Sequence, residues 1–336
     1  MPQEIELKLI LDTELSADAD LLLDSLEGVQ SKLSTRLVNT YFDTPSRAVH
    51  RAGRTLRIRR DGDRWIQTLK RSAQQGAGGL SKRSEWEWDI QSQDLDLNRL
   101  ADLLPKTINL STLAPLFSTD FERKIWLLDF HGSQIVAFID LGLITASGAS
   151  EPISEIELEI KSGDISTLLS LAKYLVAQIP LRVGVLSKAG RAAHLLSQSL
   201  KPDQQHAPSV LRSSEIVTPP SESLAEALIK WERLFECLCR DLSCDSLSDA
   251  KRSLNELSEV VGNKLSGSES SDLSTLIEQI ENHFSEHSDR LESNNFELNE
   301  TTEQIQQLCN TLINTKAIGR LSIEAAVLIN QRLEVK

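Results

Sequence analysis

The stretch Glu4-Ile5-Glu6-Leu7-Lys8, close to the start of the chain, has a charged residue at every second position. Side chains alternate between the two faces of a β-strand, so the three charged residues share one face, and Ile5 and Leu7 share the other. We therefore expect a strand here, with one charged face and one apolar face.

The same alternation recurs in three later segments. Acids about 6.6 Å apart on one face repel by only about 0.6 kcal/mol in water, but the repulsion grows sharply where water is excluded. A closed charged face would therefore need cations among its acids. The residues that share a charged face are Arg57 and Arg59 in the first segment, Arg83, Glu85, Glu87 and Asp89 in the second, and Glu155, Glu157, Glu159 and Lys161 in the third.

These charged faces allow two interpretations. One is an antiparallel sheet whose charged face meets solvent, which is a common arrangement. The other is a closed barrel with the charges inside, whose apolar outer face is covered by helices. Such a tunnel could hold a polyanion, because Lys and Arg bind phosphate oxygens while paired glutamates hold divalent cations that bridge to phosphate. The stacking of acids in pairs and triplets favours the tunnel.

The first 200 residues alternate mainly with the period of strands. The step Asp61-Gly62-Asp63 between two strands is a strong hairpin signal. The glycine-rich stretch 74–79 is expected to be a flexible loop that takes no part in the chemistry. Expected strands are 3–11, 36–43, 54–61, 64–71, 81–90, 119–130, 133–146 and 153–162, and expected helices are 16–27, 93–104, 164–178 and 187–199.

A change of pattern divides the chain. Residues 201–220 are polar and rich in proline, and are expected to be a linker. Residues 221–336 have apolar residues at helical spacing, with breaks at 262–271 and 292–299, and predict a bundle of three to five helices. The expected fold class is therefore α+β, with a β-barrel and its covering helices over residues 1–200 and a C-terminal all-α bundle.

The charge of the chain is −13 and is unevenly distributed. Residues 211–336 hold 12 Lys/Arg and 22 Asp/Glu, whereas residues 1–210 hold 24 and 27. So acidic a chain is a poor candidate for nucleic-acid binding, which needs a positive surface. There is no basic-apolar signal segment and no uncharged stretch of about 18 residues, so we expect a cytoplasmic protein without membrane association.

Cysteine and histidine give no sign of a metal site. The cysteine spacing fits neither a disulfide framework nor a zinc motif, and predicts reduced core thiols. His283 and His287 are four residues apart, and are expected to be surface residues rather than a metal-binding pair. The four cysteines are Cys237, Cys239, Cys244 and Cys309.

The opening Glu-x-Glu-x-Lys resembles the hallmark of the CYTH superfamily, the triphosphate tunnel metalloenzymes. Further matching segments run in family order through residues 3–195. They are Tyr41-Phe42-Asp43-Thr44-Pro45, Leu56-Arg57-Ile58-Arg59, Thr68-Leu69-Lys70, Arg83-Ser84-Glu85-Trp86-Glu87, Phe121-Glu122-Arg123, Ile139-Asp140-Leu141-Gly142, Ile153-Ser154-Glu155-Ile156-Glu157-Leu158-Glu159 and Ser187-Lys188-Ala189-Gly190-Arg191.

The resemblance implies an eight-stranded antiparallel tunnel that binds a small triphosphate with Mg²⁺ or Mn²⁺. It implies that the phosphates are bound by Lys8, Arg57, Arg59, Lys70, Arg123 and Lys188, with help from Arg83 and Arg191. It implies that metals and the attacking water are positioned by Glu4, Glu6, Glu155 and Glu157, with Glu85, Glu87, Asp140 and Glu159 as further ligands. The catalytic set is then Glu4, Glu6 and Lys8. No serine, cysteine or histidine nucleophile is needed, because phosphoryl transfer depends mainly on positioning and charge neutralisation.

Two features depart from the family pattern. Arg191 is followed by Ala192-Ala193, where relatives often have Gly-Tyr. The C-terminal region resembles a reduced or divergent CHAD domain, but it is short and acidic rather than basic. It could instead dock a protein partner or a second copy of the chain.

Hydrolysis of inorganic tripolyphosphate to pyrophosphate and phosphate is the leading functional hypothesis, because a fused helical domain resembles the bacterial inorganic triphosphatases. The alternatives within the family are a class IV adenylyl cyclase and a thiamine or nucleoside triphosphatase. A thiamine triphosphatase would need an aromatic platform near the tunnel mouth. A non-catalytic polyanion-binding module is the alternative from another class, although retention of both acidic clusters argues against it.

Overall fold

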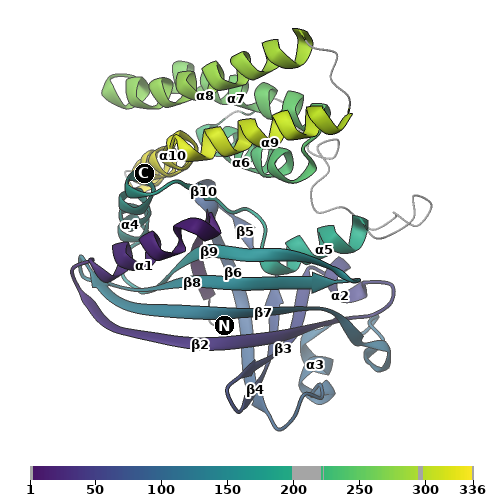
Figure 1. Ribbon diagram of the computed structural model, residues 1–336. Coiled ribbons are helices and arrows are strands. Elements are labelled where there is room, and N and C mark those ends of the chain that lie inside the picture. The colour runs from purple at the N-terminus through teal and green to yellow at the C-terminus, as the bar shows by residue number, and fades with distance from the viewer. Residues whose placement is uncertain (1–2, 199–220, 222, 294–297, 335–336) are drawn as a thin grey trace.

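The computed structural model describes residues 3–198, 221, 223–293 and 298–334. Its N-terminal part is a closed, eight-stranded antiparallel β-barrel, and helices stand over one side of it (Figure 1). Around the barrel the strands follow the order β1 (Gln3–Leu11), β9 (Ala149–Ser162), β8 (Ser133–Ala146), β7 (Ala114–Phe130), β2 (Val29–Asp43), β3 (Arg54–Asp61), β4 (Arg64–Arg71) and β6 (Leu80–Ile90). The short strands β10 (Leu181–Val183) and β5 (Gln74–Gln75) extend the sheet.

Strand β1 closes the barrel, because it pairs on one side with β9 and on the other with β6. In this register Lys8 lies opposite Glu157, and Glu4 lies opposite Arg83. Residues from the two ends of the predicted motif series are therefore cross-strand neighbours, whose side chains are close enough to interact. The tunnel predicted from the alternating charges is confirmed.

Apolar residues face outward and are covered. Leu7 and Leu9 of β1 are fully buried against Leu158 of β9 and helix α4 (Ile165–Gln178). A second apolar group, which includes Leu69 and Trp88, lies beneath helices α2 (Ala48–Arg51) and α3 (Leu97–Leu103). The remaining helices of this part are α1 (Ser16–Asp24) and α5 (Lys188–Gln198), with 3-10 turns η1 (Thr13–Leu15), η2 (Ala77–Gly79) and η3 (Leu110–Thr112).

The described C-terminal residues form five helices, within the predicted three to five. They are α6 (Leu224–Asp241), α7 (Cys244–Lys264), α8 (Ser268–Ser293), α9 (Leu298–Asn314) and α10 (Ala317–Glu334). Apolar residues of this bundle, among them Trp231 and Ala326, belong to the same hydrophobic cluster as Leu7 and Leu158 of the barrel. The barrel and the helices are thus joined by one continuous core. The predicted linker 201–220 lies outside the described residues.

Several element boundaries differ from the prediction, most clearly those of β2, β7 and α3. Strands β2 and β7 begin seven and five residues before the expected 36–43 and 119–130, because the two strands pair with each other along nearly their full length. Part of this extension is exposed, as at Leu33, so its sequence lacks the alternation of a half-buried strand. Helix α3 begins after Asp96, whose carboxylate accepts hydrogen bonds from the backbone N–H groups of Asn98 and Arg99.

The glycine-rich stretch is the clearest correction to the prediction. Instead of a flexible loop, Ala77, Gly78 and Gly79 are buried in η2, which contacts α6 and α10. Gly78 donates its N–H to Oε1 of Glu232 at 3.0 Å, and burial raises the pKa of that carboxyl to about 8. The absence of side chains is what lets the helices approach this turn.

Two side-chain expectations were also wrong. Cys244 is exposed rather than a core thiol, although all four cysteines are free and Cys237 and Cys309 are buried. His287 is buried rather than at the surface, since α8 turns this residue toward the bundle interior. Within the described part of the chain, no helix combines the length and apolarity needed to cross a membrane.

We predict that Gly78→Ala destabilises the fold far more than Gly62→Ala. Both glycines have positive φ, but an added Cβ at Gly78 would lie 2.5 Å from Cβ of Ala326, whereas Gly62 has open space. The backbone conformation alone costs about 1–2 kcal/mol, and overpacking should bring the loss at Gly78 to about 3 kcal/mol or more. Urea unfolding measures both, and equal losses would contradict the close approach.

Candidate active site

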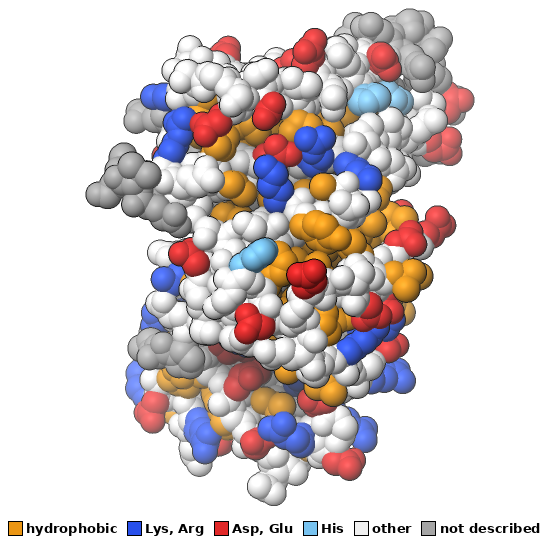
Figure 2. Space-filling model, turned by 90° about the vertical axis from the view of Figure 1, so that its left-hand side faces the viewer, with side chains coloured by type: hydrophobic (Ala, Val, Ile, Leu, Met, Phe, Trp, Pro, Cys, Tyr) orange, Lys and Arg blue, Asp and Glu red, His pale blue; other side chains and the backbone are white. Residues whose placement is uncertain are grey.

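A cavity of about 590 Å³ lies inside the barrel, and side chains from all eight barrel strands line it. Eleven Lys or Arg and seven Asp or Glu side chains contribute to the lining, a net charge of +4 with His50 neutral. The whole chain carries −13, and on the face in Figure 2 the two signs are interspersed. A concave, net-positive space in an acidic protein favours an anionic ligand.

Most residues predicted for the site line this cavity. The exceptions are Asp140, Glu155 and Arg191, which are buried and contact residues of the lining instead. The predicted residues that do line it are Glu4, Glu6, Lys8, Arg57, Arg59, Lys70, Arg83, Glu85, Glu87, Arg123, Glu157, Glu159 and Lys188.

The lining also includes arginines that the sequence analysis did not predict for the site, namely Arg54, Arg71 and Arg233. Arg54 and Arg71 are cross-strand partners at the ends of β3 and β4, where the alternation of faces no longer shows which side a residue takes. Arg233 belongs to α6, far from the motif series, so only the tertiary structure brings it to the cavity.

Lys8 and Lys188 hold the most buried acids of the site together. The Nζ of Lys8 lies 3.0 Å from Glu155 and also contacts Glu157. The Nζ of Lys188 donates to Asp140 and Glu155, and lies 3.2 Å from Glu157. Burial opposes the charged form of both lysines, but the neighbouring carboxylates outweigh it and raise both pKa values. Loss of any partner would leave an uncompensated buried charge.

Arg123 adds a rigid contact to this cluster. Its guanidinium donates to both oxygens of Asp140, at 2.7 and 2.6 Å, and to Glu157 at 2.6 Å. The ring of Phe138 lies against it, with the centroid 4.1 Å from Cζ. Such bidentate geometry fixes the orientation of both the carboxylate and the arginine.

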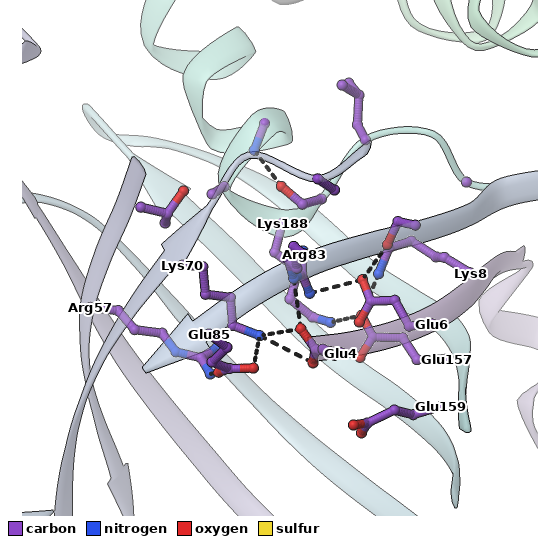
Figure 3. Close-up of a pocket in the computed structure, with 18 of the residues that line it drawn as sticks. Glu4, Glu6, Lys8, Arg57, Lys70, Arg83, Glu85, Glu157, Glu159 and Lys188 are labelled. Atoms are coloured by element: carbon purple, nitrogen blue, oxygen red, sulfur yellow. Dashed lines mark hydrogen bonds and ion pairs between the residues drawn. The ribbon is translucent and has the colours of Figure 1, made fainter. Parts of the chain in front are cut away.

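The acids of β1 are held by a second set of cations (Figure 3). Arg83 Nε lies 2.7 Å from Glu4, and its Nη2 lies 2.8 Å from Glu6. Lys70 Nζ lies 3.2 Å from Glu4 and 3.0 Å from Glu85. Burial disfavours ionisation of Glu4, but Lys70 and Arg83 outweigh it and lower its pKa, so the carboxylate stays charged.

Glu6 and Glu159 are directly opposite each other in the pairing of β1 with β9. Opposed like charges destabilise a sheet. Burial raises the pKa of Glu159, despite the contact that this carboxylate makes with Lys161. The carboxylate of Glu4 also raises the pKa of Glu159, so a divalent cation among the acids of this face would relieve their repulsion.

Two arginines on the opposite wall lack close ion pairs, whereas the neighbouring Lys70 is paired with Glu4 and Glu85. The nearest carboxylate oxygens of Glu85 and Glu87 lie 3.7 and 3.5 Å from Arg57, whose buried Nε has no hydrogen-bond partner. Arg59 donates to Asn39 at 3.0 Å and forms no ion pair with any described carboxylate, and burial with Arg57 and Arg123 lowers its pKa to about 10. Burial, Arg83 and Arg57 also lower the pKa of Lys70. These groups are placed to accept an anion.

The site also contains oxygen ligands suited to a hard divalent cation. Among the described residues, Asp140, Glu155 and Glu157 form a group whose carboxylate oxygens lie within 4.8 Å of one another. Lys8 and Lys188 already balance these charges, so a metal ion there requires the ammonium groups to turn toward another anion. Glu6 and Glu159 are less fully balanced, and both line the cavity.

A model of the CYTH domain matches residues 2–193, which include all sixteen predicted site residues. The chain belongs to the CYTH family. This CYTH protein is similar to the inorganic triphosphatase of Haemophilus influenzae, with 33% identity over 205 residues. The match covers 60% of this chain and 58% of that protein, so it spans little more than half of the relative's length.

Solved structures similar to this chain include two proteins whose names contain adenylyl or adenylate cyclase. One is a Hippeastrum protein whose description reports a dominant triphosphatase activity, with 18% identity and a TM-score of 0.44 over 60% of this chain and 100% of that chain. The other is from Bacillus halodurans, with 20% identity and a TM-score of 0.35 over 52% of this chain and 91% of that chain.

We predict opposite effects of Arg59→Met on stability and on ligand binding. Removing a buried cation that lacks an acidic partner should leave the free protein as stable or more stable. The loss of a charge-assisted contact should weaken inorganic tripolyphosphate binding by about tenfold or more. Thermal unfolding and calorimetric titration measure the two effects.

Arg123→Met serves as the comparison, because Arg123 is fully paired with Asp140 and Glu157. This variant should lower the melting temperature. An Arg59 variant that loses stability like the Arg123 variant, or that binds tripolyphosphate like the wild type, would contradict the assignment of Arg59 to the anion.

Proposed function

We propose that this CYTH protein hydrolyses inorganic tripolyphosphate to pyrophosphate and phosphate, with Mg²⁺ or Mn²⁺ as the cofactor. The observation that supports this most strongly is the cavity inside the closed barrel, in which an excess of cations faces clustered carboxylates. The similarity to an inorganic triphosphatase supports the same reaction class. A linear polyanion complexed with a divalent cation matches both kinds of charge in the lining.

In this proposal the role of each basic residue in phosphate binding depends on how completely carboxylates neutralise it. Arg57 and Arg59 bind the phosphate chain first, because acids neutralise them incompletely. Lys70 joins them, since burial and the neighbouring Arg83 and Arg57 lower its pKa despite its contacts with Glu4 and Glu85. Lys8 and Lys188 bind phosphate when their ammonium groups exchange a carboxylate contact for a phosphate oxygen. Arg123 keeps the acidic cluster in place during this exchange.

The acids that face the cavity hold the cofactor and the attacking water. Glu6 and Glu159 are opposed across two strands, and Glu4 lies on the same face of β1. A bound divalent cation neutralises phosphate charge and acidifies water at such a site. The carboxylates orient the nucleophile without forming a bond to it, so in-line attack requires no covalent residue.

The aromatic residues of the cavity favour an inorganic substrate over an organic triphosphate. Tyr41 stacks on Phe117 with ring centroids 4.3 Å apart. Phe121 and Phe138 lie against Lys188 and Arg123, respectively. The aromatic groups that could stack on adenine or thiamine are thus already in contact with other side chains.

The opposed acids also favour an enzyme over a module that only binds polyanions. Simple anion binding gains nothing from Glu6 facing Glu159, because each carboxylate repels the ligand. A metal-dependent reaction explains both the acids and the cations. Phosphate release from tripolyphosphate, ATP and thiamine triphosphate, with and without divalent cations, distinguishes the candidates.

We predict that wild-type protein releases phosphate from tripolyphosphate only with Mg²⁺ or Mn²⁺. Glu6→Gln should lower kcat by at least about a hundredfold, because this acid supports the reaction rather than binding. Its Kd for tripolyphosphate without metal should stay the same or fall, because a repelling charge is removed. Rapid conversion of ATP to cyclic AMP would contradict the triphosphatase assignment. Tight binding without any metal-dependent turnover would establish the binding module instead.

A further inference from the structure

Helix α6 belongs to the C-terminal bundle, yet one of its faces meets the rim of the tunnel. Glu232, Glu236 and Arg240 follow one another at intervals of four residues, so they lie on the same face of the helix. Glu232 contacts the turn at Gly78, and Arg233 beside it lines the cavity. Figure 1 shows α6 above the barrel on the side where α5 begins.

Glu236 is the central contact of this face. Its exposed fraction is 1%, and its Oε2 accepts hydrogen bonds from the backbone N–H groups of Val185, at 2.7 Å, and Leu186, at 3.4 Å. Arg182 Nη1 lies 3.9 Å from the same oxygen. A buried carboxylate is costly unless its contacts are strong, so this one contributes to holding the backbone that it binds.

The segment that Glu236 holds leads directly to Lys188. On the barrel side, Gly184 donates its N–H to the carbonyl oxygen of Lys8 at 3.0 Å, and a Cβ at Gly184 would lie 2.9 Å from Cδ of Lys8. The carbonyl of Val185 accepts a hydrogen bond from Gln75 at 3.4 Å. The segment is thus fixed between the barrel and α6, and Lys188 follows it at the start of α5.

Arg240 reaches the other side of the same cluster. Its guanidinium donates to both oxygens of Glu151, at 2.9 and 2.7 Å. Glu151 also accepts from Arg191 at 2.6 Å, and Arg191 donates to Glu155 at 3.0 Å. Helix α6 therefore contacts the surroundings of both Lys188 and Glu155.

We propose that Glu236 is a positioning residue for the phosphate-binding Lys188, so that the helical region is a working part of the site rather than an appendage. This inference rests on the proposed function, in which Lys188 binds a phosphate oxygen. Loss of the Glu236 acceptor leaves two backbone N–H groups without their partner and lets the segment shift. Lys188 then moves relative to Asp140 and the cavity.

The test is a double-mutant cycle between Glu236 and Lys188, measured as the Kd for inorganic tripolyphosphate without divalent cations. Glu236→Ala should raise Kd by about tenfold, the expected effect of losing hydrogen bonds to a charged group. Lys188→Ala should raise it at least as much. If Glu236 acts through Lys188, the double variant should stay within about twofold of Lys188→Ala alone, because coupled residues are not additive.

Two further variants separate positioning from simple destabilisation. Glu236→Gln keeps an acceptor oxygen, and should restore Kd to within about twofold of the wild type, because the net charge is not what holds the amides. Lys230→Ala, in the same helix as Glu236, removes the 2.6 Å ion pair that Lys230 makes with Glu256 of α7. Lys230 does not line the cavity, so this variant should leave Kd unchanged. Thermal unfolding of every variant shows whether it is folded. If Glu236→Ala does not fold, Glu236→Asp, whose carboxylate is shorter by one methylene, takes its place in the cycle.

A wild-type Kd in folded Glu236→Ala, or in Glu236→Asp where that variant replaces it, would overturn the positioning role. A double variant whose Kd rises by the product of the two single effects would overturn it as well. Because the cycle measures binding alone, it can be interpreted even if no triphosphate is hydrolysed. Absence of hydrolysis by the wild type, with an intact binding cycle, would count against the proposed reaction and not against the role of Glu236.

Discussion

The structure depends on the neutralisation of charged side chains inside a closed barrel. Charges removed from water are expensive unless they are paired and hydrogen-bonded. Lys8 of β1 contacts two carboxylates of β9, which is far from it in sequence, and Arg123 of β7 contacts one carboxylate on β8 and one on β9. With the charges inside, the apolar faces must lie outside, and helices must cover them. Because the apolar residues of the barrel face outward, they can form one core with the apolar residues of the helical bundle.

The same balance of charge explains why the cavity can have a function. Its pairing is nearly complete around Asp140 and Glu155, and is incomplete around Arg57 and Arg59. The wall around Asp140 and Glu155 is therefore stable without a ligand, whereas the wall around Arg57 and Arg59 is stabilised when an anion binds. A site that was fully paired would have little reason to bind phosphate, and one without pairing would not fold around its charges. The opposed Glu6 and Glu159 complete the arrangement, since they favour a cation on the same side.

Much of the fold could be predicted from the sequence, because a period of two assigns each strand residue to a face, whereas the roles of most site residues were predicted from the resemblance to the CYTH superfamily. That rule placed Glu4, Lys8 and Glu157 on the charged faces of their strands, and all three line the cavity. It could not separate lining residues from those behind them, such as Asp140 and Glu155, since depth is set by packing. Nor could it find Arg233, or the burial of Gly78, because both result from how α6 and α10 dock on the barrel. Contacts between regions distant in sequence leave no local periodicity.

The central claim is that the cavity holds a linear triphosphate and a divalent cation together. A crystal structure with Mn²⁺ and a slowly hydrolysed tripolyphosphate analogue tests this directly, because the anomalous signal of Mn²⁺ locates the metal independently of the anion. The account predicts phosphate oxygens against Arg57, Arg59 and Lys70, and at least one Mn²⁺ bound between the phosphates and the carboxylates of Glu6 or Glu159. An anion bound outside the barrel, or a cavity with the anion but no metal peak at saturating Mn²⁺, would contradict it.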